Sequence, residues 1–98
     1  MSERILVVDD EAGIVRLCQR MLDKAGYEVL TSTNPAEGLK ILSRERIDLM
    51  LTDIRMPIMD GFELIRQAKK TQPDLAVVVM TGFGTVETAI QALQRGVD

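Results

Sequence analysis

Short apolar runs alternate with amphipathic segments along this 98-residue chain. Apolar runs cover residues 4–8, 48–53 and 75–81, and a weaker alternating stretch covers residues 27–32. Their β-branched and aliphatic residues are typical of strands, and the strand at 27–32 is expected at an edge of the sheet. Helices separated from strands by short connections require right-handed crossovers, which build a parallel sheet. The pattern therefore predicts an α/β fold in a single domain.

Local signals place the ends of the predicted helices. Asn34 and Pro35 form an N-cap followed by proline at the first helical position, and Gly26 stands where a helix end favours a left-handed residue. Thr85 is a candidate N-cap for the last helix. The expected helices cover residues 14–25, 35–46, 61–70 and 85–97. The apolar stripes expected to face the sheet are Ile14, Leu17, Cys18, Met21, Leu22 and Ala25 in the first helix, and Phe62, Ile65 and Ala68 in the third, with Leu64 beside the stripe.

Composition narrows the classes of function. Twelve basic and fifteen acidic residues give a net charge of -3, which argues against a nucleic-acid groove or an anionic membrane as a partner. The chain has no histidine and one cysteine, which excludes the usual zinc sites, Ser-His or Cys-His catalysis and an internal disulfide. Cys18 lies on an apolar stripe and is expected to be a buried hydrophobic residue. Since no signal peptide or membrane span is evident, the expected location is the cytoplasm.

Polar side chains gather where the predicted strands end. Asp9 and Asp10 follow the first strand, Asp53 closes the third and Thr81 closes the fourth. Ligands of open α/β sheets bind at this edge, so these side chains are expected to converge there. Three carboxylates repel one another unless a cation neutralises them, and oxygen ligands suit Mg²⁺. Asp53 beside such a cation is a candidate phosphoryl acceptor, since carboxylates form acyl phosphates.

Each of these residues also has a purely structural explanation. Asp10 could cap the first helix, Asp53 could begin a turn, and Thr81 could bond its own backbone before Gly82. The run of acids at residues 9–11 could also favour the helix dipole. Taken together these explanations weaken, because none accounts for an acidic pair at one strand end and an acid and a hydroxyl at two others.

The motifs at these strand ends resemble those of the receiver domain of two-component response regulators, over residues 4–98. The resemblance implies a flavodoxin-like sheet of order 2-1-3-4. It also implies that Asp53 is the phosphoacceptor, that Asp10 and Asp53 ligate Mg²⁺ with the backbone carbonyl of Arg55, and that Asp9 helps through water. The motifs are VVDDE at 7–11, LTDIRMPIMDG at 51–61, VVVMTG at 77–82 and AIQALQRGVD at 89–98.

Further roles follow from the same resemblance. Thr81 is the switch hydroxyl that moves to hydrogen-bond the phosphoryl group, and Gly82 leaves that group room. Pro57 and Gly61 match the loop after the phosphoacceptor. The implied partner is a histidine kinase or phosphotransfer protein that donates a phosphoryl group, so the chain is expected to be a signalling domain rather than an enzyme.

The chain departs from the family pattern after residue 98. The family continues with a fifth strand, a lysine that pairs with the phosphoryl group and a fifth helix, whereas the four lysines here all lie on predicted helices. Residues 1–98 are therefore expected to form a receiver domain that is incomplete at its C-terminus. In a sheet of order 2-1-3-4 the first helix alone lies on one face, and one helix is too narrow to cover four strands. If the chain ends at Asp98, a homo-oligomer is expected to bury the rest of that face.

Three alternatives stay open from the sequence. A phosphatase of the haloacid-dehalogenase type also uses a nucleophilic aspartate, but that pattern requires Asp-x-Asp and position 55 is arginine. A flavin-binding protein would need a phosphate cradle in the first loop, which is Asp-Asp-Glu here. A truncated receiver could fold or oligomerise without competent switching. The output domain and the cognate kinase are not encoded in these residues.

Overall fold

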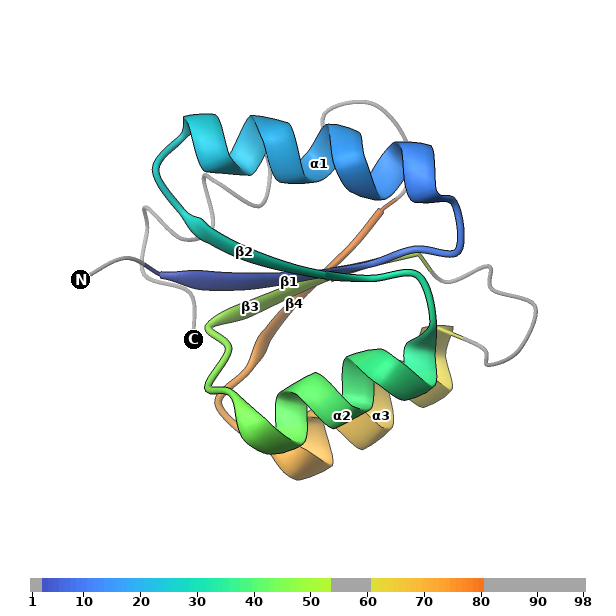
Figure 1. The fold of residues 1–98 in the computed structure, drawn as a ribbon. Coiled ribbons are helices and arrows are strands. Elements are labelled where there is room, and N and C mark those ends of the chain that lie inside the picture. Colours follow the sequence, from blue (N-terminus) through green and yellow to red (C-terminus); the bar gives the residue numbers. More distant parts are fainter. Residues whose placement is uncertain (1–2, 54–60, 81–98) are drawn as a thin grey trace.

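The chain folds around a four-stranded parallel sheet (Figure 1). The computed structural model describes residues 3–53 and 61–80, and the structural statements below concern those residues. The strands lie in the order β2-β1-β3-β4, and every neighbouring pair is parallel. This confirms the predicted fold class and strand order. The described elements are β1 (Arg4–Val8), α1 (Ala12–Lys24), β2 (Glu28–Ser32), α2 (Pro35–Arg44), β3 (Leu49–Thr52), α3 (Gly61–Thr71) and β4 (Ala76–Val79).

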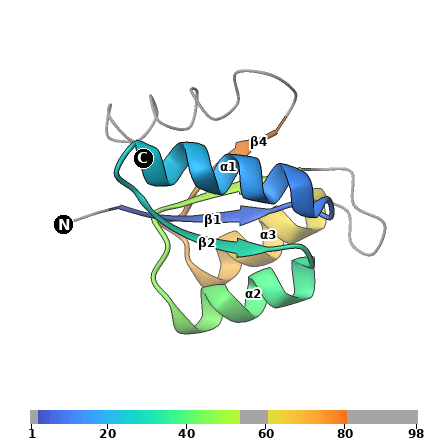
Figure 2. The ribbon, with the colours of Figure 1, turned by 45° about the horizontal axis from the view of Figure 1, so that its top comes forward.

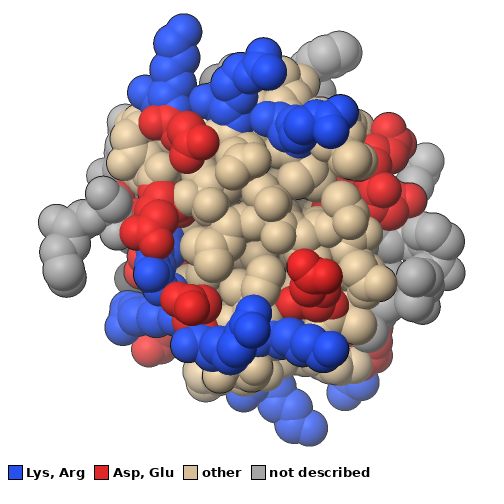
Figure 3. All heavy atoms as spheres, viewed as in Figure 1, with Lys and Arg blue, Asp and Glu red and all other residues tan. Residues whose placement is uncertain are grey.

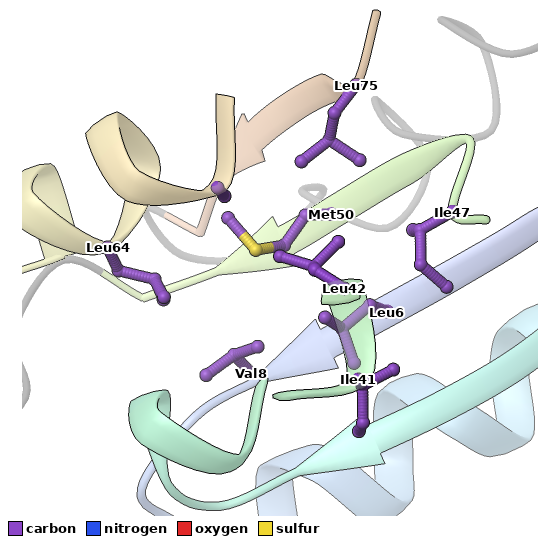
Figure 4. Close-up of a cluster of buried hydrophobic side chains, with 9 residues drawn as sticks. Leu6, Val8, Ile41, Leu42, Ile47, Met50, Leu64 and Leu75 are labelled. Carbon is purple, nitrogen blue, oxygen red and sulfur yellow. The ribbon is translucent and has the colours of Figure 1, made fainter. Parts of the chain in front are cut away.

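Helices cover the sheet on both faces. Helix α1 lies on one face, and α2 and α3 lie side by side on the other (Figures 1 and 2). Successive residues of β1 point to opposite faces, so Ile5 and Val7 pack under α1 while Leu6 and Val8 pack under α2 and α3. Figure 4 shows the second of these two cores, in which Met50 of β3 lies among side chains from both helices. Burial on both faces explains the unbroken apolar runs of β1 and β3.

The helix signals predicted at Gly26, Asn34 and Pro35 are present in the structure, and Thr85 lies outside the described residues. Gly26 has a φ of 98°, a left-handed conformation that glycine adopts without strain. The Asn34 side chain accepts a 2.8 Å hydrogen bond from the backbone N–H of Ala36, and Pro35 is the first residue of α2. Gly38 faces β1 so closely that an added Cβ would lie 3.1 Å from a methyl carbon of Val8. These features hold the α1–β2 turn and the start of α2.

Several element ends differ from the predicted ranges. Helix α2 ends at Arg44 rather than near residue 46, because Glu45 is already extended with φ -119° and ψ 139°. Strand β3 excludes Asp48 and Asp53, and β4 covers Ala76–Val79 instead of residues 75–81. The predicted helix at residues 85–97 lies outside the described residues. So do four predicted site residues, Arg55, Pro57, Thr81 and Gly82.

The apolar stripes predicted for two helices were partly wrong. In α1 the buried side chains are Val15, Cys18 and Leu22, and in α3 they include Leu64 and Ala68. A helix lying on a sheet buries only the narrow strip that touches the strands, so the neighbouring apolar positions stay outside. Predicted stripe residues that are exposed are Ile14, Leu17, Met21, Ala25 and Phe62. Cys18 is buried as predicted, and burial raises the pKa of its thiol.

Candidate functional site

Backbone hydrogen bonds bring the ends of β1 and β3 to one edge of the sheet. The N–H of Asp9, directly after β1, donates to the carbonyl of Ser32 in β2 at 3.2 Å. The N–H of Asp53, directly after β3, donates to the carbonyl of Val8 in β1, also at 3.2 Å. Since β1 and β3 are adjacent and parallel, both aspartates leave the sheet at the same edge.

Three predicted site residues meet at this edge. Asp9, Asp10 and Asp53 each offer a carboxylate oxygen, and these atoms all lie within 4.8 Å of one another. The predicted convergence of the three carboxylates is thus observed. Asp9 is buried with 2% of its surface exposed, Asp53 is half-buried and Asp10 is exposed. Gly61 begins α3 and is buried, and it follows the segment that leads away from Asp53.

The buried member of this cluster has a raised pKa. Loss of solvent around the carboxylate, together with the nearby carboxylates of Asp10 and Asp53, raises the pKa of Asp9 to about 6. The backbone N–H of Glu11 opposes this effect, because it donates a 2.9 Å hydrogen bond to one carboxylate oxygen. The cluster therefore concentrates negative charge that is costly without a compensating cation.

The donor chemistry of the cluster fits Mg²⁺. The side chains that the cluster offers are carboxylates, whose oxygens a hard cation prefers over nitrogen or sulfur. One donor comes from the buried Asp9 while Asp10 is exposed, so a cation held by the cluster would keep access to water. Mg²⁺ usually retains several water ligands and binds through one or two carboxylates.

Comparison with known proteins identifies the family. The sequence pattern of the family described as "Response regulator receiver domain" matches residues 5–98. The chain is 34% identical to sporulation initiation phosphotransferase F of Bacillus subtilis over 96 residues, which cover 98% of this chain and 77% of that protein. The chain belongs to the response regulator receiver family. Receiver domains of two-component systems are phosphorylated on aspartate and act as signalling domains.

Two further comparisons give a longer relative and a solved structure. The chain is 41% identical to the transcriptional regulatory protein GlrR of Escherichia coli over 93 residues, which cover 95% of this chain and 21% of GlrR. It therefore spans about a fifth of that relative's length. A crystal structure of the response regulator protein TrrA of Thermotoga maritima, in complex with Mg²⁺-BeF, matches with a TM-score of 0.76 at 33% identity. That match covers 93% of this chain and 79% of TrrA.

Sequence reasoning missed two features next to the cluster. The first is the buried hydroxyl of Thr52, which lies within the motif at 51–61 but was given no role there. The second is an exposed apolar row on α1, formed by Ile14, Leu17 and Met21 with exposed fractions of 37%, 56% and 37%. The sequence signals this row only by giving α1 more apolar residues than a helix on one sheet face can bury.

Proposed function

We propose that this receiver takes a phosphoryl group onto Asp53 from a phosphohistidine of a partner kinase or phosphotransfer protein. The observation that carries the proposal is the meeting of Asp9, Asp10 and Asp53 within 4.8 Å at the carboxyl end of β1 and β3. Asp53 is half-buried, so a donor can reach it from solvent. Family membership favours this function over a phosphatase of the haloacid-dehalogenase type or a flavin-binding protein.

The proposed reaction is a direct transfer between two side chains. A carboxylate oxygen of Asp53 attacks the phosphorus atom and forms a new P–O bond, while the P–N bond to the imidazole breaks. The electron pair of the broken bond stays on the imidazole nitrogen, which then takes a proton from solvent. The product is an acyl phosphate on Asp53. Hydrolysis of this acyl phosphate resets the domain. The receiver is also proposed to assist both its own phosphorylation and this hydrolysis.

Asp10 and Asp53 are proposed to hold Mg²⁺ directly, with the backbone carbonyl of Arg55, while Asp9 acts through water. When bound, Mg²⁺ supplies positive charge against the oxygens of the transferred group. Asp9 is well suited to an outer role because the backbone N–H of Glu11 already occupies one of its oxygens. Pro57 and Gly61 are proposed to shape the loop that leads from Asp53 to α3.

Thr81 is proposed to read the phosphoryl group by its hydroxyl, beside Gly82. The alternative is a receiver that folds or oligomerises without competent phospho-switching. The expected self-association of the 98-residue polypeptide also stays a prediction. The cytoplasmic location also stays a prediction. Among the described residues, no helix has the length and apolar character to cross a membrane.

Acetyl phosphate labelling tests the proposed function. The wild-type chain, incubated with acetyl phosphate and Mg²⁺, is expected to gain the mass of one phosphoryl group, and peptide mapping is expected to place it on Asp53. Omitting Mg²⁺ or adding EDTA should lower the labelling rate by at least about tenfold, because the acidic cluster then repels the anionic donor. Absence of any label with Mg²⁺ would reject the proposed function.

The exposed row on α1 is proposed to receive the phosphohistidine partner. It begins directly after the acidic cluster, because α1 starts at Ala12. The exposed basic residues Arg16, Arg20 and Lys24 recur every four positions and so share one line along the helix. In Figure 3, basic side chains follow the edge of the molecule where α1 lies, next to uncharged surface. An apolar partner surface rimmed by acidic groups fits this arrangement.

Leu17→Asp should separate docking from chemistry. The variant places a charge on the most exposed residue of the apolar row, so transfer from a phosphorylated histidine kinase is expected to slow by about tenfold or more. Labelling by acetyl phosphate should remain within about twofold of wild type, because the small donor needs no docking surface. Equal slowing with both donors would indicate damage to the site instead.

A further inference from the structure

The hydroxyl of Thr52 is buried directly beside the proposed phosphoacceptor. Thr52 is the last residue of β3, and none of its surface is exposed. Its backbone lies in register with Val8 of β1 and Val79 of β4, and its carbonyl accepts a 2.8 Å hydrogen bond from the N–H of Met80. The residue is therefore fixed on both sides by the sheet.

The side chain of Thr52 extends the hydrogen-bonded part of the sheet by one residue. Its hydroxyl donates a 3.0 Å hydrogen bond to the backbone carbonyl of Asp53. The N–H of Asp53 already donates to the carbonyl of Val8 at 3.2 Å. Both backbone polar groups of Asp53 are thus bonded to atoms of the sheet, although Asp53 itself lies beyond the last residue of β3.

We propose that Thr52 is a positioning residue for phosphoryl transfer, an inference that rests on the proposed function of Asp53. By holding the Asp53 carbonyl, the hydroxyl restricts rotation of the backbone that carries the acceptor. The carboxylate is then kept beside Asp9 and Asp10 before the donor arrives. Restricting an acceptor in this way raises the rate of transfer, because small displacements at a reacting group are costly.

Packing alone does not require a hydroxyl at this position. Valine has nearly the same shape as threonine and favours strands equally, and Val8 and Val79 stand beside Thr52 in the sheet. A buried hydroxyl lowers stability unless it is hydrogen-bonded. The part of the chain that the structure describes gives this hydroxyl one specific partner, the Asp53 carbonyl. The hydroxyl is therefore explained by its hydrogen bond to the backbone of the acceptor residue and not by packing in the core.

Two substitutions separate positioning from a structural role. Thr52→Val keeps shape and burial but removes the donor, whereas Thr52→Ser keeps the donor but removes a methyl group. With acetyl phosphate and saturating Mg²⁺, Thr52→Val is expected to be labelled about fivefold to tenfold more slowly than wild type, and Thr52→Ser within about twofold of it. Urea unfolding should give the opposite order, with the serine variant less stable than the valine variant.

The outcomes are distinguishable. If wild type is not labelled at all, the proposed function of Asp53 fails. If wild type is labelled and Thr52→Val is labelled equally fast, the function of Asp53 stands and the positioning role of Thr52 is overturned. A serine variant as slow as the valine variant would also overturn it, because the rate would then follow packing and not the hydroxyl.

Discussion

Replacing Asp53 by asparagine is expected to abolish phosphoryl labelling. The amide keeps the size of the carboxylate but lacks a nucleophilic oxygen, so the labelling rate should fall by at least about a thousandfold. The fold should survive, because the backbone N–H of Asp53 bonds to Val8 and its carbonyl to Thr52 through atoms that the substitution does not change. Phosphate-binding gel electrophoresis or intact mass after incubation with acetyl phosphate measures the effect.

Asp74→Asn is the matched control for this experiment. Asp74 is exposed and lies just before β4, at the opposite end of the strands from the acidic cluster. Asp74→Asn makes the same chemical change and the same change in net charge as Asp53→Asn, but far from the cluster. Labelling of this control variant should therefore equal that of wild type. Label that persists on another residue of the Asp53→Asn variant would contradict the assignment of the phosphoacceptor. Unchanged circular dichroism would show that the loss is chemical.

Asp9→Asn is expected to stabilise the Mg²⁺-free protein at neutral pH by at most about 3 kcal/mol. The pKa of Asp9 is raised from an ordinary value of 3.8 to about 6, chiefly because the carboxyl group is buried. The difference sets an upper limit of about 3 kcal/mol on the cost of ionising Asp9 in the folded state relative to the unfolded chain, and solvent screening at the edge of the sheet lowers that cost. Asparagine avoids this cost and can still accept the hydrogen bond from the N–H of Glu11.

The effect of Asp9→Asn has a defined pH dependence. An acid with a raised folded-state pKa binds more protons when folded, so its contribution to stability is fully present below pH 3.8 and is lost as pH rises through about 6. The stability difference between variant and wild type should thus vanish near pH 3.8 and reach its maximum above about pH 7. Urea unfolding in EDTA across this range measures it. A difference independent of pH would show that ionisation of Asp9 is not the cause.

Added Mg²⁺ should narrow the difference in stability between the two proteins. Wild type gains free energy of unfolding by binding the cation, and the variant gains less because its cluster has lost one negative charge. Asp74→Asn again serves as the control, since a remote charge should change neither the pH profile nor the Mg²⁺ dependence. Equal stabilisation of all three proteins by Mg²⁺ would argue that the cation binds elsewhere.

Much of the fold was predictable because its signals are local. The apolar run of β1 stops at Asp9 and Asp10, Pro35 follows a capping asparagine, and Gly26 adopts the positive φ that its place after α1 suggested. The strand order followed from the resemblance to the receiver family, because short right-handed connections limit the possible parallel arrangements without selecting one of them. The ends of elements were less certain, because residues such as Glu45 lie at helix ends where neighbouring conformations differ little in energy.

The buried face of α1 was not predictable to the residue. Seven apolar side chains in α1 spread around more than one side of the helix, and the sequence pattern does not indicate which of them touch the sheet. Contact with β1 and β3 decides that Val15, Cys18 and Leu22 are inside and that Leu17 is outside. The same holds for Phe62 in α3, where Leu64 and Ala68 face the core.

For the candidate site, the sequence alone predicted which carboxylates come together and are candidates for the chemistry. Asp9, Asp10 and Asp53 follow strands whose order places them at one edge, and the motifs around them resemble a receiver. Only the tertiary structure decided how these groups differ. Burial singles out Asp9 as the carboxyl with the raised pKa, and the hydroxyl of Thr52 reaches the Asp53 carbonyl. Both depend on solvent exclusion and on distances between atoms, which arise only when the sheet and helices pack together.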